Sequence, residues 1–184
     1  NHPTVKAGNG TIAITGVGGN TDNTDTPWLG QLNSANEGIS LASGGQVVVT
    51  GAAGHIELTG TGGNAGQGGN NGITVYSAGT GDPVTGVFAT GGGTITMPGT
   101  ANGPSNYGNG SHGIFVSGDR SQVQSTAAIT LTGYGIANGV GSQNSDGVAV
   151  LSGASIVTTA NGAIQITGTG GGTLANPLDQ SGYG

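Results

Sequence analysis

Cysteine is absent from the 184-residue chain, and charged and aromatic residues are scarce. Without cysteine the chain forms no disulfide and no metal–thiolate site. Lys6 and Arg120 are its only lysine and arginine, whereas a phosphate backbone is held by several such groups together. We therefore expect no nucleic-acid partner, and the same shortage argues against anionic lipid. No run of 18 apolar residues is present, so we expect no membrane insertion.

Glycine, by contrast, supplies 43 residues, and proline adds 6. Such a content without periodicity is typical of a disordered linker. Here valine, isoleucine and leucine recur at regular intervals, and these are the residues that disordered chains lack. Only 5% of the residues are charged, so threonine, serine, asparagine and glutamine are expected to cover the exterior.

Two short phrases recur along the chain. One phrase closes five segments: GTIAITG (10–16), GHIELTG (54–60), GTITMPG (93–99), AAITLTG (127–133) and GAIQITG (162–168). The other opens at Gly38, Gly72, Gly113 and Gly147, which gives steps of 34, 41 and 34 residues. A period in this range is typical of a solenoid with one winding per repeat.

The clearest repeat is 147–168, GVAVLSGASIVTTANGAIQITG. Its three β-branched runs, separated by small-residue turns, predict three strands. We therefore predict an all-β fold, a right-handed parallel β-helix (β-solenoid) of about five three-strand coils of roughly 34 residues, with loop insertions. The chain is expected to be one domain, 1–184. A partial coil and long loop at 1–37 precede coils at 38–71, 72–112, 113–146 and 147–184.

Alternation along each strand predicts which side chains point inward. The second strands are ambiguous, because Val48 competes with Val47 and Val49, and an insertion disturbs Val84 and Val87. Both ends are expected to be uncapped, since the first-strand phrase is missing before residue 38 and another first strand is expected at Gly184. The inward side chains predicted in third and first strands are Ile12, Ile14, Ile56, Leu58, Ile95, Met97, Ile129, Leu131, Ile164 and Ile166, then Ile39, Leu41, Ile73, Val75, Ile114, Val116, Val148 and Val150.

Longer phrases of the chain resemble the β-strand repeats of giant bacterial surface proteins, in the style of filamentous-haemagglutinin-like adhesins. They include SNYGNGSHGIFVSG, GHIELTGTGGN and SQNSDGVAVLSGASIVTTANGAIQITGTGGG. The resemblance covers nearly all of 1–172 and implies a secreted β-helical shaft at the cell surface, without catalytic residues. It therefore suggests a structural or adhesive segment that associates with itself end to end or laterally. The long loop at 16–38 departs from this style.

Acidic residues offer little support for an enzyme. Glu57 is the only acid on a predicted strand, and its expected neighbours Ala13 and Thr96 supply no second carboxylate, which a glycosidase needs. A catalytic triad is recognised by geometry rather than by residue types, and we favour a polar turn ladder and no enzymatic activity. This ladder precedes the first strands and contains Glu37, Asn71, His112 and Asp146, with Ser111 and Ser145 beside the last two.

The loop at 16–38 carries two further candidates. Asp22 and Asp25 supply two hard oxygens, whereas Ca²⁺ requires six to eight, so calcium is a weak expectation and no other cofactor is expected. Trp28 and Leu29 either fold back on the solenoid wall or contact a partner.

The outward positions of the strands suggest two surfaces. Tyr76, Phe115 and Leu151 predict an exposed apolar stripe, which would serve as a lateral interface or a glycan or receptor platform unless loops cover it. This stripe carries the alternative function, a carbohydrate-binding or carbohydrate-active module. On the third strands one threonine column is nearly complete and another is broken, which is a poor match to an ice-binding face.

Overall fold

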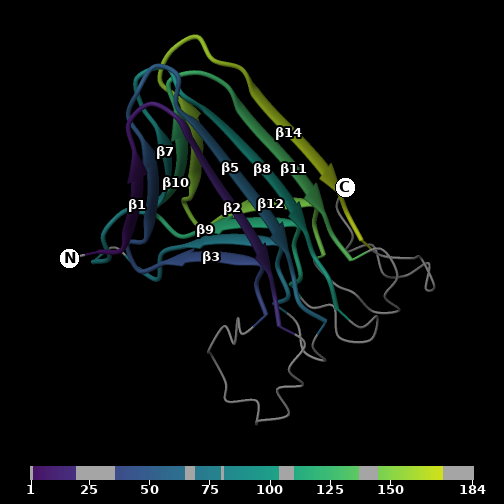
Figure 1. Cartoon of the computed structure of the whole chain (residues 1–184). Coiled ribbons are helices and arrows are strands. Elements are labelled where there is room, and N and C mark those ends of the chain that lie inside the picture. Colours follow the sequence, from purple (N-terminus) through teal and green to yellow (C-terminus); the bar gives the residue numbers. More distant parts are fainter. Residues whose placement is uncertain are drawn as a thin grey trace.

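The computed structural model describes residues 2–19, 36–64, 69–79, 81–103, 110–136 and 145–171. These residues form β-strands joined by turns, and no helix occurs among them (Figure 1). Every strand pairs in parallel with its equivalents in neighbouring repeats, so the chain winds through three sheets in turn. The predicted all-β solenoid is thereby confirmed. No helix in the described ranges is long and apolar enough to span a bilayer.

The three sheets form the walls of the solenoid. Sheet A contains β1 (Thr4–Ala7), β4 (Gln46–Val49), β7 (Thr85–Ala89), β10 (Ser121–Ser125) and β13 (Ser155–Thr158). Sheet B contains β2 (Thr11–Val17), β5 (His55–Thr61), β8 (Thr94–Thr100), β11 (Ile129–Tyr134) and β14 (Ile164–Thr169). Sheet C contains β3 (Ile39–Ala42), β6 (Ile73–Tyr76), β9 (Ile114–Ser117) and β12 (Val148–Leu151).

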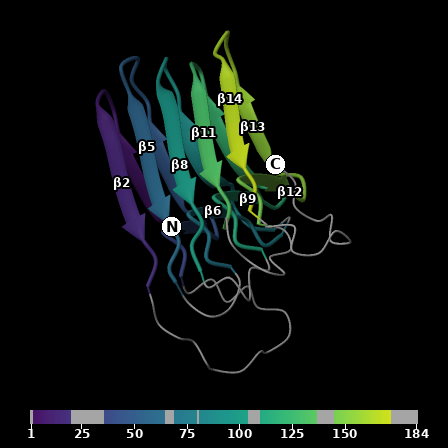
Figure 2. The same cartoon turned by 90° about the vertical axis from the view of Figure 1, so that its right-hand side faces the viewer.

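The register of the sheets follows the repeat read from the sequence. Ile39 pairs with Ile73, Ile73 with Ile114, and Ile114 with Val148, so residues 34, 41 and 34 positions apart lie side by side. Figure 2 shows the same order in sheet B, whose strands run parallel from β2 to β14. The extra residues of the 41-residue step leave the pairing intact, because they lie between β6 and β7 and within the connection from β8 to β9.

The core is a column of inward aliphatic side chains stacked along the solenoid axis. The alternation predicted for the first and third strands is confirmed in the middle of the column, where these side chains are fully buried. The structure also resolves the ambiguous second strands. In β4, Val47 and Val49 point inward and Val48 is half-buried. In β7, Val87 and Ala89 are both buried, and Val84 precedes the strand.

Tight turns connect the first strand of a repeat to its second strand. Ser43 (φ 50°) and Gly44 (φ 87°) both have positive φ, and the Gly45 N–H donates to the Ala42 carbonyl at 2.9 Å. The turn at Ser152 and Gly153 has the same form, with φ of 53° and 80°. Two consecutive positive φ values define a type I′ turn, which glycine favours. The Ser-Gly punctuation of the sequence therefore has a conformational cause.

Glycines are also required where the end of each third strand passes the start of the next first strand. A Cβ at Gly60 would lie 2.0 Å from the carbonyl oxygen of Gly72, and one at Gly133 would lie 1.9 Å from that of Gly147. No side chain fits at this crossing. The glycine that ends each closing phrase and the glycine that begins the next opening phrase therefore meet at one corner of the solenoid. Each long connection begins and ends at this corner.

Candidate functional site

A polar ladder crosses four neighbouring repeats just before the first strands. The backbone N–H of His112 donates to Oδ1 of Asn71 at 2.7 Å. The backbone N–H of Asp146 lies 3.3 Å from Nδ1 of His112, and the Asp146 carboxylate lies 3.3 Å from the same nitrogen. The predicted contact between His112 and Asp146 therefore forms. Each of these side chains contacts the equivalent residue of the next repeat, so the ladder holds successive windings together.

The same ladder lies against the outer face of sheet C. Nδ2 of Asn71 donates to the Thr74 hydroxyl at 3.1 Å, and the ring of His112 stacks on Phe115 with centroids 5.0 Å apart. Both contacts join a residue to its third neighbour along the chain. This spacing places ladder side chains over the outward residues of the strands that follow, and Thr74 is consequently buried although it points away from the core.

Burial shifts the pKa values of Glu37 and His112 in opposite directions. It raises the pKa of Glu37 above its ordinary value, and the polar side chains of Ser40, Thr74 and Asn71 partly oppose the shift. Within the described residues, Oε2 of Glu37 is buried without a hydrogen-bond partner. Burial also lowers the pKa of His112, although the Asp146 carboxylate opposes this change. Both groups are therefore biased toward their neutral forms.

The ladder does not have the geometry of a nucleophilic triad. Ser111 is fully buried, and its hydroxyl accepts the Asn70 backbone N–H at 3.3 Å rather than facing His112. A nucleophile must reach both its base and a substrate. The arrangement places a carboxylate beside His112, but Ser111 and Ser145 are buried, and we interpret it as a structural element.

The predicted apolar stripe is divided between two ladders of sheet C. Tyr76 and Leu151 share one ladder, with Ser117 between them, whereas Phe115 lies on the other, beside Ala149. Leu151 is exposed, while Tyr76 and Phe115 are half-buried. One face of the Phe115 ring is already occupied by His112. The stripe is therefore narrower and less accessible than the alternation alone predicts.

Glu57 has the surroundings read from the sequence, since it pairs with Ala13 and Thr96 on the exposed face of sheet B. No group of three or more histidine or acidic side chains suited to a metal ion occurs in the part of the chain that the structure describes. The calcium candidates Asp22 and Asp25 lie outside the described residues, as do Trp28 and Leu29.

The last described repeat leaves the core column open. Ile164 and Ile166 align with Ile129 and Leu131 of β11, yet they are 43% and 49% exposed, whereas their β11 partners are 0% exposed. Among the described strands β14 pairs with β11 alone, β13 with β10 alone and β12 with β9 alone. This end therefore presents apolar side chains together with strand edges that have no partner strand among the described residues.

Sequence reasoning missed two features of the outer faces. On sheet A, Val48 and Phe88 lie side by side on the outside of β4 and β7, but the insertion before β7 obscured the alternation there. On sheet B, the strands continue past their glycines to Val17, Thr61 and Thr100, which adds a further outward column. The Thr-Gly-Thr spacing at 59–61 is the sequence signal that could have revealed it.

Comparison of the chain with protein-family models, with curated proteins and with solved structures finds no match.

Proposed function

We propose that this chain is a structural or adhesive shaft segment of an extracellular β-solenoid at a bacterial cell surface, which stacks or continues end to end. In this proposal the solenoid is right-handed and has five windings of three strands. Its function is to form a rigid shaft with few charged side chains rather than to turn over a substrate. The resemblance of the repeat phrases to giant surface proteins supports the location.

The open end is the observation that carries the proposal. Ile164 and Ile166 expose apolar surface that their β11 partners bury completely. Unpaired strand edges recruit further strands, and contacts between unlike ends that do not close give filaments. A further winding on β14 would complete both the hydrogen bonds and the apolar column.

The opposite end presents edge strands in the same order, although Ile12 there is 8% exposed and Ile14 is half-buried. In a direct stack of two copies, β14 of one copy would meet β2 of the next, and Ile164 and Ile166 would meet Ile12 and Ile14 in the alternation used throughout sheet B. Likewise β13 would meet β1, whose Val5 is 50% exposed. Sheet C has one strand fewer than the others, so this stack leaves one strand position open between β12 and β3 of the next copy.

Imaging tests this proposal. Negative-stain micrographs of the full chain at increasing concentration are expected to show rods that lengthen in steps of one solenoid. An Ile166→Lys variant introduces a charge that must be desolvated on stacking, and it should shift the distribution toward single units. Gln124→Lys, which changes charge on the outer wall of sheet A, serves as the control. Single short units at every concentration for the unaltered chain would contradict the stacking of copies.

A carbohydrate-binding role ranks second. It depends on Tyr76 and Phe115, which are half-buried and lie on different ladders. Glycan-array binding that is lost in a Tyr76→Ser, Phe115→Ser variant, with rods still forming, would reverse this ranking.

A further inference from the structure

Sheet B presents a regular outer face of five parallel strands (Figure 2). Three outward columns cross it, each with one residue from every strand. The columns in strand order from β2 to β14 are Ala13, Glu57, Thr96, Thr130 and Gln165; Thr15, Thr59, Pro98, Thr132 and Thr167; and Val17, Thr61, Thr100, Tyr134 and Thr169. Threonine therefore occupies most of the positions in this array.

The inward glycines make the last two columns possible. Gly60 lies between Thr59 and Thr61 and packs its backbone against that of Gly72, so the strand stays extended past the corner. Gly168 has the same place between Thr167 and Thr169. The columns are spaced by strand geometry, roughly 4.8 Å between strands and about 6.6 Å between alternate residues of one strand.

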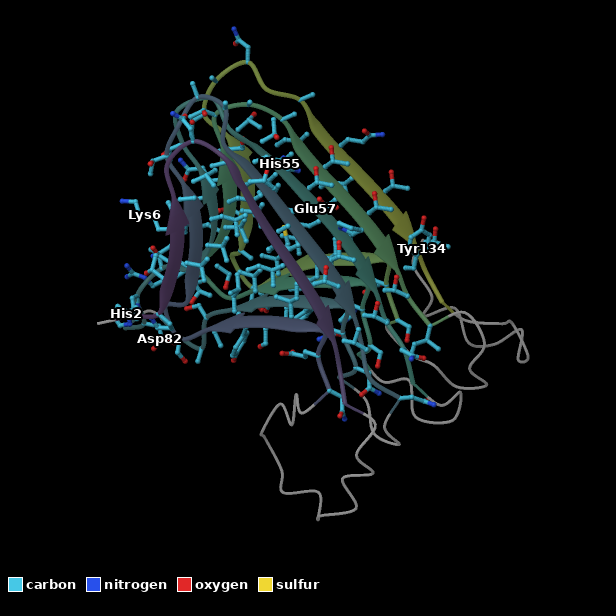
Figure 3. All side chains as sticks on the ribbon, in the orientation of Figure 1. His2, Lys6, His55, Glu57, Asp82 and Tyr134 are labelled. Carbon is cyan, nitrogen blue, oxygen red and sulfur yellow. The ribbon has the colours of Figure 1, made fainter. Side chains whose placement is uncertain are left out.

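The hydroxyls of this array are not used by the protein. The backbones of the nine threonines of the three columns bond within the sheet, but their hydroxyls have no hydrogen-bond partner among the described residues. This contrasts with the outer face of sheet C, where the Thr74 hydroxyl is bonded and buried. Glu57 is the only charged side chain on the three columns, and Figure 3 places it, with Tyr134, on sheet B. The face thus carries a single charged side chain, is exposed or half-buried, and is periodic in two directions.

We propose that this face of sheet B binds the surface of ice. Ice presents a neutral lattice of water oxygens that repeats in two directions, and its recognition needs many weak, evenly spaced contacts rather than a pocket. A threonine offers a hydroxyl that can enter the water lattice and a methyl group that fills the gap between waters. β-Branched side chains hold these groups in few rotamers, so little entropy is lost on binding.

The composition of the face argues against a sugar ligand there. Sugar sites place aromatic rings and a few convergent polar groups in a concave surface. Tyr134 is the only aromatic residue of the three columns, and it lies in the column nearest the strand ends. The proposal does not depend on end-to-end stacking, because every unit carries the array on its own wall.

The experiment grows single ice crystals in solutions of the full chain at low micromolar to millimolar concentration and measures crystal shape and freezing hysteresis. The unaltered chain is expected to facet the crystals and to hold them below their melting point. Thr132→Lys places a charged side chain in the middle column of the array and should abolish most of the hysteresis. Gln124→Lys on sheet A, at a similarly half-buried outward position, should leave the hysteresis unchanged.

Circular dichroism melting establishes that each variant is folded. If Thr132→Lys does not fold, Thr132→Val and Thr132→Ser replace it, and a reduced hysteresis in either folded variant supports the array. Round, unfaceted crystals with the unaltered chain would overturn the proposal. It would also be overturned by equal activity in all folded variants of Thr132, or by an equal loss in Gln124→Lys.

Discussion

The middle and the end of sheet B contain nearly the same side chains in different surroundings. Ile129 and Leu131 on β11 are completely buried, whereas Ile164 and Ile166 on β14 occupy the same two ladders and are about half exposed. Their strands, alternation and flanking glycines are alike. The difference shows that at the β14 end the burial of an inward side chain depends on a further winding, whereas Ile12 on the opposite edge strand β2 is only 8% exposed.

This dependence on neighbours explains how so few apolar residues hold the chain together. Each repeat contributes only short strands, and the stability of solenoids is approximately a sum of repeat and nearest-neighbour terms. A middle winding has two neighbours and an end winding has one. Equivalent substitutions should therefore have unequal effects, and three pairs of variants test this expectation.

The largest difference is expected between Leu131→Ala and Ile166→Ala. Leu131 is enclosed on all sides, so its truncation should lower the free energy of unfolding by about 2–5 kcal/mol. Ile166 is about half exposed, and its truncation should lower the free energy of unfolding by roughly half as much or less. Chemical denaturation of both variants at a concentration where the chain is monomeric provides the measurement. Equal losses would show that the end winding is covered after all.

A smaller difference is expected between Gly133→Ala and Gly168→Ala. A Cβ at Gly133 would overlap the Gly147 carbonyl oxygen, whereas the nearest atom to a Cβ at Gly168 is the Val148 nitrogen at 3.3 Å. The middle variant should lose about 1–3 kcal/mol of stability, as overpacked cores do. The end variant should melt close to the unaltered chain. The reverse order would place the tight crossing elsewhere.

The smallest effects concern the polar ladder and its pH dependence. Because the folded state lowers the pKa of His112, it binds fewer protons there than the unfolded chain, and stability should fall as the pH drops below the ordinary value of 6.5. Folding raises the pKa of Glu37, so this group stabilises the folded state at pH values below its ordinary pKa of 4.5. That stabilisation is lost as the pH rises through the higher pKa of the folded state.

Matched variants separate the two groups. In melting curves recorded between pH 4 and 8, Glu37→Gln should abolish the loss of stability above pH 4.5. His112→Gln should abolish the loss of stability below pH 6.5. Identical pH profiles for the unaltered chain and both variants would mean that neither group is perturbed by the ladder.

The features that repeat were predictable from the sequence, and those that depend on a single repeat were not. Ile56 and Leu58 could be placed inward because alternation and the glycine phrases recur at fixed steps. The exposure of Ile166 does not follow from the alternation of its own strand, which predicts an inward side chain, but from what lies beside that strand at an end expected to be uncapped. Likewise the burial of Phe115 follows from a histidine three residues earlier, whose side chain turns over the outer face.

Of the candidate site, the sequence predicted the order of the polar ladder and the contact between His112 and Asp146, since both follow from the register. It did not predict that Ser111 would be buried away from His112, because the corner geometry that buries it is set by backbone packing. The further threonine column was hidden for the same reason, as a strand was expected to stop at its glycine.

Hydrogen exchange of the backbone amides tests the central claim most directly. In dilute solution, where units are single, the amides of β8 and β11 are expected to exchange slowly and those of β14 quickly. At concentrations where rods form, protection of β14 should rise to the level of β11. Protection of β14 that equals that of β11 in single units, or that does not change with concentration, would contradict a solenoid whose open end is completed by a further winding.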